Sequence, residues 1–183
     1  MKKLQTGDIP RLNKENYRSS KKLPVTIVLD NIRSHHNVGA FFRTADAFRF
    51  SQLILTGITG CPPHRDIRKT ALGSTETVDW TYVKDIHKAV KQLKTGGTKL
   101  IAVEICSKST ALQDFHLASD TPVGLIFGNE VHGVQQTVID MCDECIEIPQ
   151  CGTKHSLNVS VSGGIVMWEI FRQTKNLLPD DQG

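Results

Sequence analysis

The sequence predicts an α/β domain with a mostly parallel sheet that is covered by helices on both faces. Three observations carry this prediction. Short runs rich in Val, Ile and Leu are typical of buried parallel strands, segments with helical periodicity lie between them, and no repeat or long linker interrupts the 183 residues. A chain of this length can form one domain with a substantial core.

Strands are predicted where short apolar and β-branched runs end at glycine, proline or polar residues. They cover residues 25–29, 52–55, 81–83, 100–105, 123–127 and 145–148. Helices are predicted between them, at residues 37–48, 67–72, 85–93, 134–141 and 156–172. Asn37, Asp85 and Ser156 are placed as N-caps of their helices, and the pair Gly96-Gly97 ends the helix that follows Asp85.

The net charge is +3, and the basic residues are unevenly distributed. Residues 1–24 hold seven lysines and arginines against two acidic residues. Such an arm could hold a phosphate backbone, or it could equally be a solvated, frayed terminus. We therefore divide the chain into a basic N-terminal arm (1–24), one α/β domain (25–175) and a short C-terminal tail (176–183).

No apolar run approaches the roughly 20 residues that a membrane-spanning helix needs. The first residues also lack the apolar segment of a signal peptide. We therefore expect a cytoplasmic protein without a membrane partner. Its five cysteines, an odd number, are expected to be thiols.

Polar residues gather where three of the predicted strands end. Open parallel sheets bind their ligands beyond the carboxyl ends of the strands. The segment after the first strand holds Asn37 and Arg43, and the segment after residue 127 holds Gly128 and Glu130. The segment after residue 148 reads IPQCGTKHSLNVSVSGG and places small polar residues at the mouth of a core helix. These three segments are the expected ligand site.

Each of these residues also has an ordinary explanation. Arg43 could be a solvated helix arginine paired with Asp46, three residues later. Glu130 could be a solvated loop acid, and Asn37 a simple helix cap. Their shared position at strand ends favours the functional interpretation.

Three segments resemble the signature motifs of the SpoU/TrmH branch of the SPOUT methyltransferases. They are NVGAFFRTADAF (37–48), LIFGNEVHG (125–133) and IPQCGTKHSLNVSVSGGI (148–165), in the family's order, and the likeness extends over residues 25–172. Two positions depart from the family's pattern: Gln150, where a methionine is common, and the pair Ser162-Gly163, where alanines are frequent. The resemblance implies a deep C-terminal trefoil knot, a homodimer, and transfer of a methyl group from S-adenosylmethionine to a ribose 2′-hydroxyl of tRNA or rRNA, with tRNA favoured.

The resemblance also implies the site residues, motif by motif. Around the reacting ribose it places Arg43, Asn37, Glu130, Ser156 and Asn158. At the cofactor it places Leu125, Gly128, Asn129, Ile148, Pro149, Ser156, Leu157 and Asn158. In the family the motif arginine acts as the base, but an arginine pKa above about 12 also favours stabilising an alkoxide or clamping a phosphate.

RNA contacts are expected from basic residues of the arm and of the segment around the second predicted helix (67–72), together with the second subunit. These residues are Arg11, Arg18, Lys21, Lys22, Arg65, Arg68 and Lys69. Trp168, Ile170 and Phe171 of the last helix are candidates for the dimer interface, although they could equally be internal core.

Three other interpretations remain open. Cys142, Cys145, Cys151 and His155 have a spacing that could bind zinc, although we expect buried thiols and no metal. Ser156 or Ser160 could be a hydrolase nucleophile, but no G-x-S-x-G elbow is present. An RNA-binding protein without catalysis could keep the same fold.

Overall fold

The computed structural model describes residues 1–9, 11–117 and 121–179. Its centre is a parallel sheet with strand order β3-β2-β1-β6-β4-β7-β5. The strands are β1 (Leu23–Asp30), β2 (Phe50–Thr56), β3 (Asp79–Val83), β4 (Lys99–Val103), β5 (Thr110–Ala111), β6 (Val123–Phe127) and β7 (Glu144–Glu147). The predicted α/β class is confirmed.

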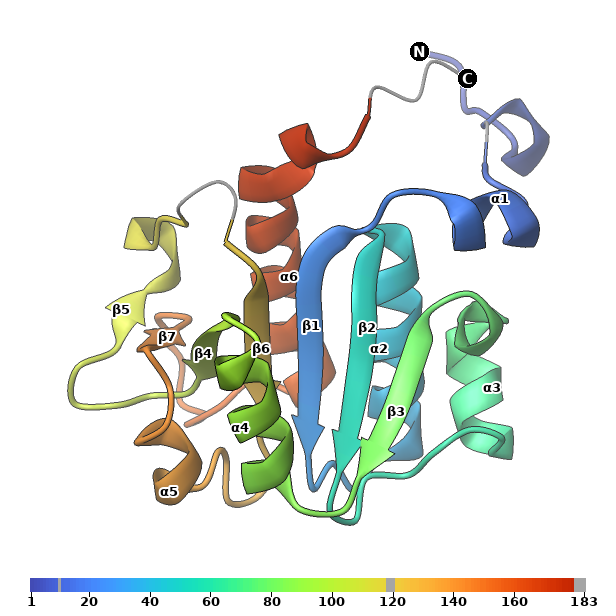
Figure 1. Ribbon diagram of the computed structural model, residues 1–183. Coiled ribbons are helices and arrows are strands. Elements are labelled where there is room, and N and C mark those ends of the chain that lie inside the picture. The colour runs from blue at the N-terminus through green and yellow to red at the C-terminus, as the bar shows by residue number, and fades with distance from the viewer. Residues whose placement is uncertain (10, 118–120, 180–183) are drawn as a thin grey trace.

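Helices cover both faces of this sheet, as Figure 1 shows. They are α1 (Lys14–Ser19), α2 (His35–Ala47), α3 (Arg65–Ala71), α4 (Ile86–Thr95), α5 (Gln136–Ile139) and α6 (Val159–Thr174). Helices α2 and α6 lie on one face and α4 on the other. Within the described residues, no helix is both long and apolar enough to cross a membrane.

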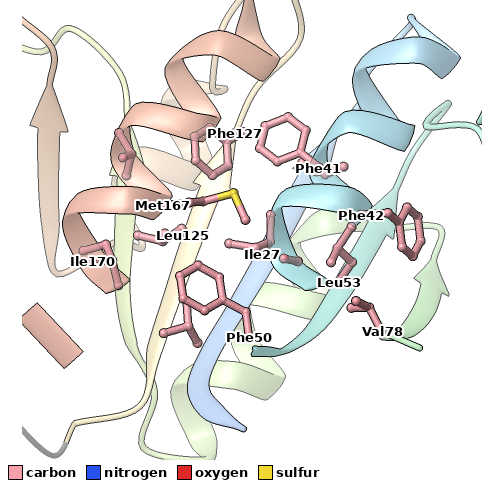
Figure 2. Close-up of a cluster of buried hydrophobic side chains, with 14 of the residues drawn as sticks. Ile27, Phe41, Phe42, Phe50, Leu53, Val78, Leu125, Phe127, Met167 and Ile170 are labelled. Atoms are coloured by element: carbon pink, nitrogen blue, oxygen red, sulfur yellow. The ribbon is translucent and has the colours of Figure 1, made fainter. Parts of the chain in front are cut away.

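The core consists of one apolar cluster on each face of the sheet. The larger cluster joins α2 and α6 to the strands, and Figure 2 shows Phe41, Phe127 and Met167 pointing into it from α2, β6 and α6. The smaller cluster packs α4 against the opposite face, with Val28 and Ile126 fully buried. Because strands buried on both faces carry apolar residues in unbroken runs, the main strands could be predicted from the sequence.

Two of the predicted N-caps are wrong. Helix α2 begins earlier, and the Ser34 side chain accepts the Asn37 N–H at 3.3 Å, so Asn37 lies inside the first turn. Helix α6 begins at Val159, and the cap is Asn158 rather than Ser156. The Asn158 side chain accepts hydrogen bonds from the backbone N–H groups of Ser160 and Val161. Asp85, by contrast, caps α4 as predicted.

Strand β4 and helix α5 are both shorter than predicted. Strand β4 ends at Val103, after which Ile105 turns outward and is 60% exposed. The Glu104 carboxylate then accepts the Val134 N–H at 2.9 Å. Helix α5 covers only Gln136–Ile139.

The N-terminal arm contains a short helix, α1, that was not predicted from the sequence. Tyr17 of α1 is 6% exposed and belongs to the larger core cluster, and β1 already begins at Leu23. The end of the C-terminal tail, from residue 180, lies outside the described residues. The trefoil knot stays a prediction.

Candidate active site

A cavity of about 530 Å³ lies at the carboxyl ends of β4, β6 and β7. Its walls come from four segments of the chain, 103–105, 127–133, 146–150 and 155–162. Next to it, β1 and β6 are neighbours in the sheet, and the segments that follow them lead toward opposite faces. Such a switch point is where open α/β sheets bind ligands.

Most of the residues predicted at the cofactor line this cavity. They are Gly128, Asn129, Ile148, Ser156, Leu157 and Asn158. Leu125 is fully buried in β6 beneath it, and Pro149 is exposed between two lining residues. Val103, Glu104 and Ile105 also line the cavity and were not predicted as site residues. Their position could have been predicted, because residues 100–105 were predicted as a strand and ligands bind beyond the carboxyl ends of parallel strands.

The segment after β6 folds back on itself to form one wall of the cavity. Asn129 and Gly133 exchange backbone hydrogen bonds of 2.8 and 3.1 Å. A Cβ atom on Gly128 would lie 2.1 Å from the Gly133 carbonyl carbon and 2.2 Å from the Val134 nitrogen. Only glycine fits where two backbone segments approach this closely.

Asn37, Glu130, Asn158 and Ser160 form one hydrogen-bonded network across three chain segments. Asn37 Nδ2 donates to Glu130 Oε1 at 3.0 Å, and Asn158 Nδ2 donates to Asn37 Oδ1 at 3.3 Å. The Ser160 hydroxyl lies 3.2 Å from Asn37 Oδ1 and 2.7 Å from Asn158 Oδ1. The motifs after β1, β6 and β7 therefore meet at one place.

Glu130 is held in its ionised form. Burial raises its pKa, but hydrogen bonds from the backbone N–H groups of Arg33 and Ser34 and from Asn37 outweigh burial, so the pKa lies below its ordinary value. The Arg33 and Ser34 bonds are 2.9 and 3.1 Å long. Glu130 is therefore an orienting carboxylate rather than a proton donor.

Ser156 and Arg43 lie outside the hydrogen-bonded network. Ser156 lines the cavity and is exposed. Arg43 lies six residues after Asn37 on α2, which is about 9 Å along the helix axis. Its side chain is exposed, and no other described residue forms an ion pair or hydrogen bond with it. The proposed pair with Asp46 is absent, since Asp46 accepts a hydrogen bond from Thr77.

The residues predicted to bind RNA fall into two groups. Arg18 donates to the Glu76 carbonyl, and Lys22 donates to the Ser20 carbonyl and lies over the Tyr17 ring, so both are engaged within the protein. The others are exposed: Arg11, Lys21, Arg65, Arg68 and Lys69. The last three line a second cavity of about 400 Å³ together with Pro63 and His64.

The last helix places only one of its three candidate interface residues at the surface. Trp168 is 54% exposed, whereas Ile170 is fully buried in the core. Phe171 is partly buried, and its ring stacks on Phe48 with centroids 5.0 Å apart. Ile170 is therefore core, and the exposed apolar residues of α6 are Val161, Ile165 and Trp168.

The zinc and hydrolase interpretations gain no support from the geometry. The sulfur atoms of Cys145 and Cys106 are 2.7 Å apart, while Cys142 Sγ donates to the Val138 carbonyl. Among the described residues, no three His, Cys, Asp or Glu side chains are grouped so that they could hold a metal ion. The Ser160 hydroxyl contacts asparagine side chains rather than an imidazole base.

The three motifs lie within the part of the chain that matches a known family. The model of the SpoU rRNA Methylase family matches residues 24–168. An uncharacterized tRNA/rRNA methyltransferase of Synechocystis is 35% identical, over 85% of this chain and 40% of its own length. A 23S rRNA (guanosine-2′-O-)-methyltransferase of Neisseria meningitidis is 32% identical, over 82% of this chain and 59% of its own.

Solved structures share the fold. The A. aeolicus TrmH/SpoU tRNA modifying enzyme superposes with a TM-score of 0.77 and 27% identity, over 90% of this chain and 81% of its own. An AdoMet-bound rRNA methyltransferase from Sinorhizobium meliloti has a TM-score of 0.77 and 25% identity, over 91% of this chain and 60% of its own. With the family model matching most of the chain, including all three motifs, this protein belongs to the SpoU rRNA methylase family.

Proposed function

We propose that this protein transfers the methyl group of S-adenosylmethionine to a ribose 2′-hydroxyl of RNA. The observation that carries the proposal is the network of Asn37, Glu130 and Asn158 at the edge of the 530 Å³ cavity. Family membership supports the reaction class. The chain spans 40% and 59% of the two curated relatives described above, so their full activities are not transferred to it directly.

The cavity has the features that the cofactor requires. Its volume lies within the range of about 300–1,000 Å³ that is typical of small-molecule sites. Ile105, Ile148 and Leu157 supply apolar walls on which an adenine can pack. Gly128 also lines the cavity, and its lack of a side chain lets the backbone of Gly133 and Val134 pack against it to close this wall. S-adenosylmethionine, when bound, supplies an electrophilic methyl group on a positively charged sulfur.

The residues of the network would orient the ribose. Asn37 and Asn158 offer amide groups to the sugar hydroxyls, and Glu130 fixes the Asn37 amide from behind. The attacking 2′-hydroxyl must lose its proton, and the resulting charge on oxygen needs a cation nearby. Arg43 is the proposed cation, since its guanidinium is exposed and unpaired among the described residues. A phosphate clamp by the same group would serve the same step.

We also propose a homodimer. Val161, Ile165 and Trp168 are spaced at i, i+4 and i+7 on α6, and they are 51%, 40% and 54% exposed. An apolar stripe of this kind, on a helix whose opposite face is buried in the core, marks a contact surface. Helix α6 begins directly after Asn158, which belongs to the network, so a second subunit on this stripe would lie near the active site. Light scattering should give a dimer, and Trp168→Glu should give monomers; unchanged mass would contradict the interface.

The proposed substrate is tRNA rather than rRNA. The A. aeolicus tRNA modifying enzyme is matched over 81% of its length, whereas the rRNA enzyme of N. meningitidis is matched over 59%. Arg65, Arg68 and Lys69 are proposed as the phosphate contacts. Their replacement by alanine should weaken tRNA binding. The slope of the logarithm of the binding constant against the logarithm of the salt concentration should become shallower by about 0.7–0.9 per lost phosphate contact. An unchanged slope would remove them from the interface.

An RNA substrate and free thiols favour a cytoplasmic location.

The decisive experiment is methyl transfer from labelled S-adenosylmethionine to unmodified tRNA and rRNA pools, followed by nucleoside digestion and mass spectrometry. We expect a 2′-O-methylated nucleoside from tRNA. Arg43→Ala should abolish transfer while the affinity for S-adenosylmethionine changes by no more than a few-fold. Wild-type transfer by this variant would remove Arg43 from the mechanism, and a methylated base would contradict the ribose assignment.

A further inference from the structure

The cavity is acidic although the protein is basic. Three glutamates line it, Glu104, Glu130 and Glu147, and none of its described lining residues is a lysine or arginine. With the imidazoles counted as neutral, the lining carries three negative charges, whereas the whole chain carries a net charge of +3. A cavity with one sign of charge concentrates its field on whatever binds there.

Neutral groups hold these carboxylates in place. Glu104 accepts the N–H groups of Ile105 and Val134, both at 2.9 Å. Glu147 accepts the Ser109 hydroxyl at 2.7 Å. Within the described chain, none of the three glutamates forms a salt bridge. The negative charge of the cavity is therefore available to a cationic ligand.

The two forms of the cofactor differ in charge. S-adenosylmethionine carries a sulfonium, an ammonium and a carboxylate, for a net charge of +1. After the methyl group leaves, the sulfur is a neutral thioether and S-adenosylhomocysteine has no net charge. A negative cavity therefore attracts the reactant more strongly than the product.

We propose that Glu104, assisted by Glu147, makes the cavity select S-adenosylmethionine over S-adenosylhomocysteine, an inference that rests on the proposed function. Glu104 is the principal residue because it follows β4 directly and both its oxygens are fixed by backbone N–H groups at the cavity wall. Glu130 contributes to the same negative charge but is left out of the test, because it also orients Asn37 at the proposed ribose site. The consequence for the cycle is that methyl transfer itself weakens retention of the spent cofactor.

Calorimetry with three ligands tests the proposal without any RNA. They are S-adenosylmethionine, S-adenosylhomocysteine and sinefungin, whose amine replaces the methylsulfonium and restores a positive charge. The wild-type protein should bind both cationic ligands more tightly than S-adenosylhomocysteine. Added salt should narrow that difference.

Glu104→Gln removes the charge but keeps the shape and one oxygen for the Val134 N–H. At an effective dielectric constant near 20, a full charge about 10 Å away changes an affinity by roughly tenfold. We therefore expect the ratio of the two dissociation constants to fall by about that factor. The ratio is the readout because a merely structural disturbance weakens both ligands together. Glu144→Gln is the matched control, since Glu144 forms an ion pair with Lys99 and does not line the cavity.

Glu147→Gln is the second variant and keeps the test open if Glu104→Gln does not fold. It should lower the same ratio, because its carboxylate also lines the cavity. Equal affinities of the wild-type protein for reactant and product, or a ratio unchanged in both variants, would overturn the selection. A wild-type protein that binds none of the three ligands would instead overturn the proposed function.

Discussion

Gly163 and Gly164 are neighbours in α6, yet the same substitution should affect them in opposite directions. A Cβ atom on Gly163 would lie 2.4 Å from Cε1 and 2.5 Å from Cζ of Phe41, whereas nothing lies within 4 Å of a Cβ atom on Gly164. The Phe41 ring cannot easily move away, because it is 1% exposed and packs against Phe127 with centroids 4.9 Å apart (Figure 2).

The expected magnitude follows from two terms. Replacing a glycine inside a helix by alanine stabilises the folded state by about 0.5–1 kcal/mol. Forcing an extra methyl group into a packed core costs about 1–3 kcal/mol. Gly164→Ala experiences only the first term and Gly163→Ala experiences both. The helix term cancels between the two variants, so their stabilities should differ by about 1–3 kcal/mol in favour of Gly164→Ala.

Urea unfolding followed by circular dichroism measures this difference. All variants are compared at one protein concentration, since dimer formation would make stability concentration-dependent. In the background Phe41→Leu, where the ring is gone, Gly163→Ala should lose most of its penalty. Equal stabilities of the two alanine variants, or a penalty that persists without the ring, would refute the reasoning. The contact with Phe41 explains why glycine stands at position 163.

Three further predictions concern the cap of α6, the acid side of the stability curve and the arm. Asn158→Ala should cost about 1 kcal/mol in urea unfolding, because the helix cap is lost, while Asn158→Ser should cost only a few tenths; equal losses would contradict the capping role. The lowered pKa of Glu130 means that its contribution to stability is present above the unfolded-state value of about 4.3 and is lost as the pH falls through the lower folded value. The melting temperature of the wild-type protein should therefore fall more steeply on acidification than that of Glu130→Gln. If the melting temperatures of the two proteins change in parallel with pH, the carboxylate is not involved. The buried Tyr17 hydroxyl has no hydrogen-bond partner among the described residues, so Tyr17→Phe should stabilise by about 1 kcal/mol, and a lower melting temperature would contradict this.

Strands and the order of the elements were predictable because their signals are local. A strand buried on both faces must be apolar at every position, and β6 was predicted with its observed bounds. The Asp85 cap was also predictable, since a cap needs only its own side chain and an N–H group two residues later.

Other caps could not be assigned from local sequence. Ser34 and Asn37 are both good N-caps, as are Ser156 and Asn158. The choice depends on tertiary contacts: Glu130 binds the Asn37 amide from a segment 93 residues away, which keeps Asn37 inside the helix. The same Asn37 amide accepts a hydrogen bond from the Asn158 side chain through its oxygen, which keeps Asn158 at the start of α6.

The sequence by itself determined the fold class, the family resemblance and the three motifs, because each is written in consecutive residues. Only the tertiary structure decided which side chains meet. Glu104 has no motif of its own, yet it stands at the cavity because β4 lies between β6 and β7 in the sheet. Arg43 belongs to the first motif, yet it lies apart from the Asn37 network, because six residues of α2 separate the two side chains by about 9 Å along the helix axis. The order of the strands in the sheet decides which charged side chains lie at the cavity, and that order is a property of the whole chain.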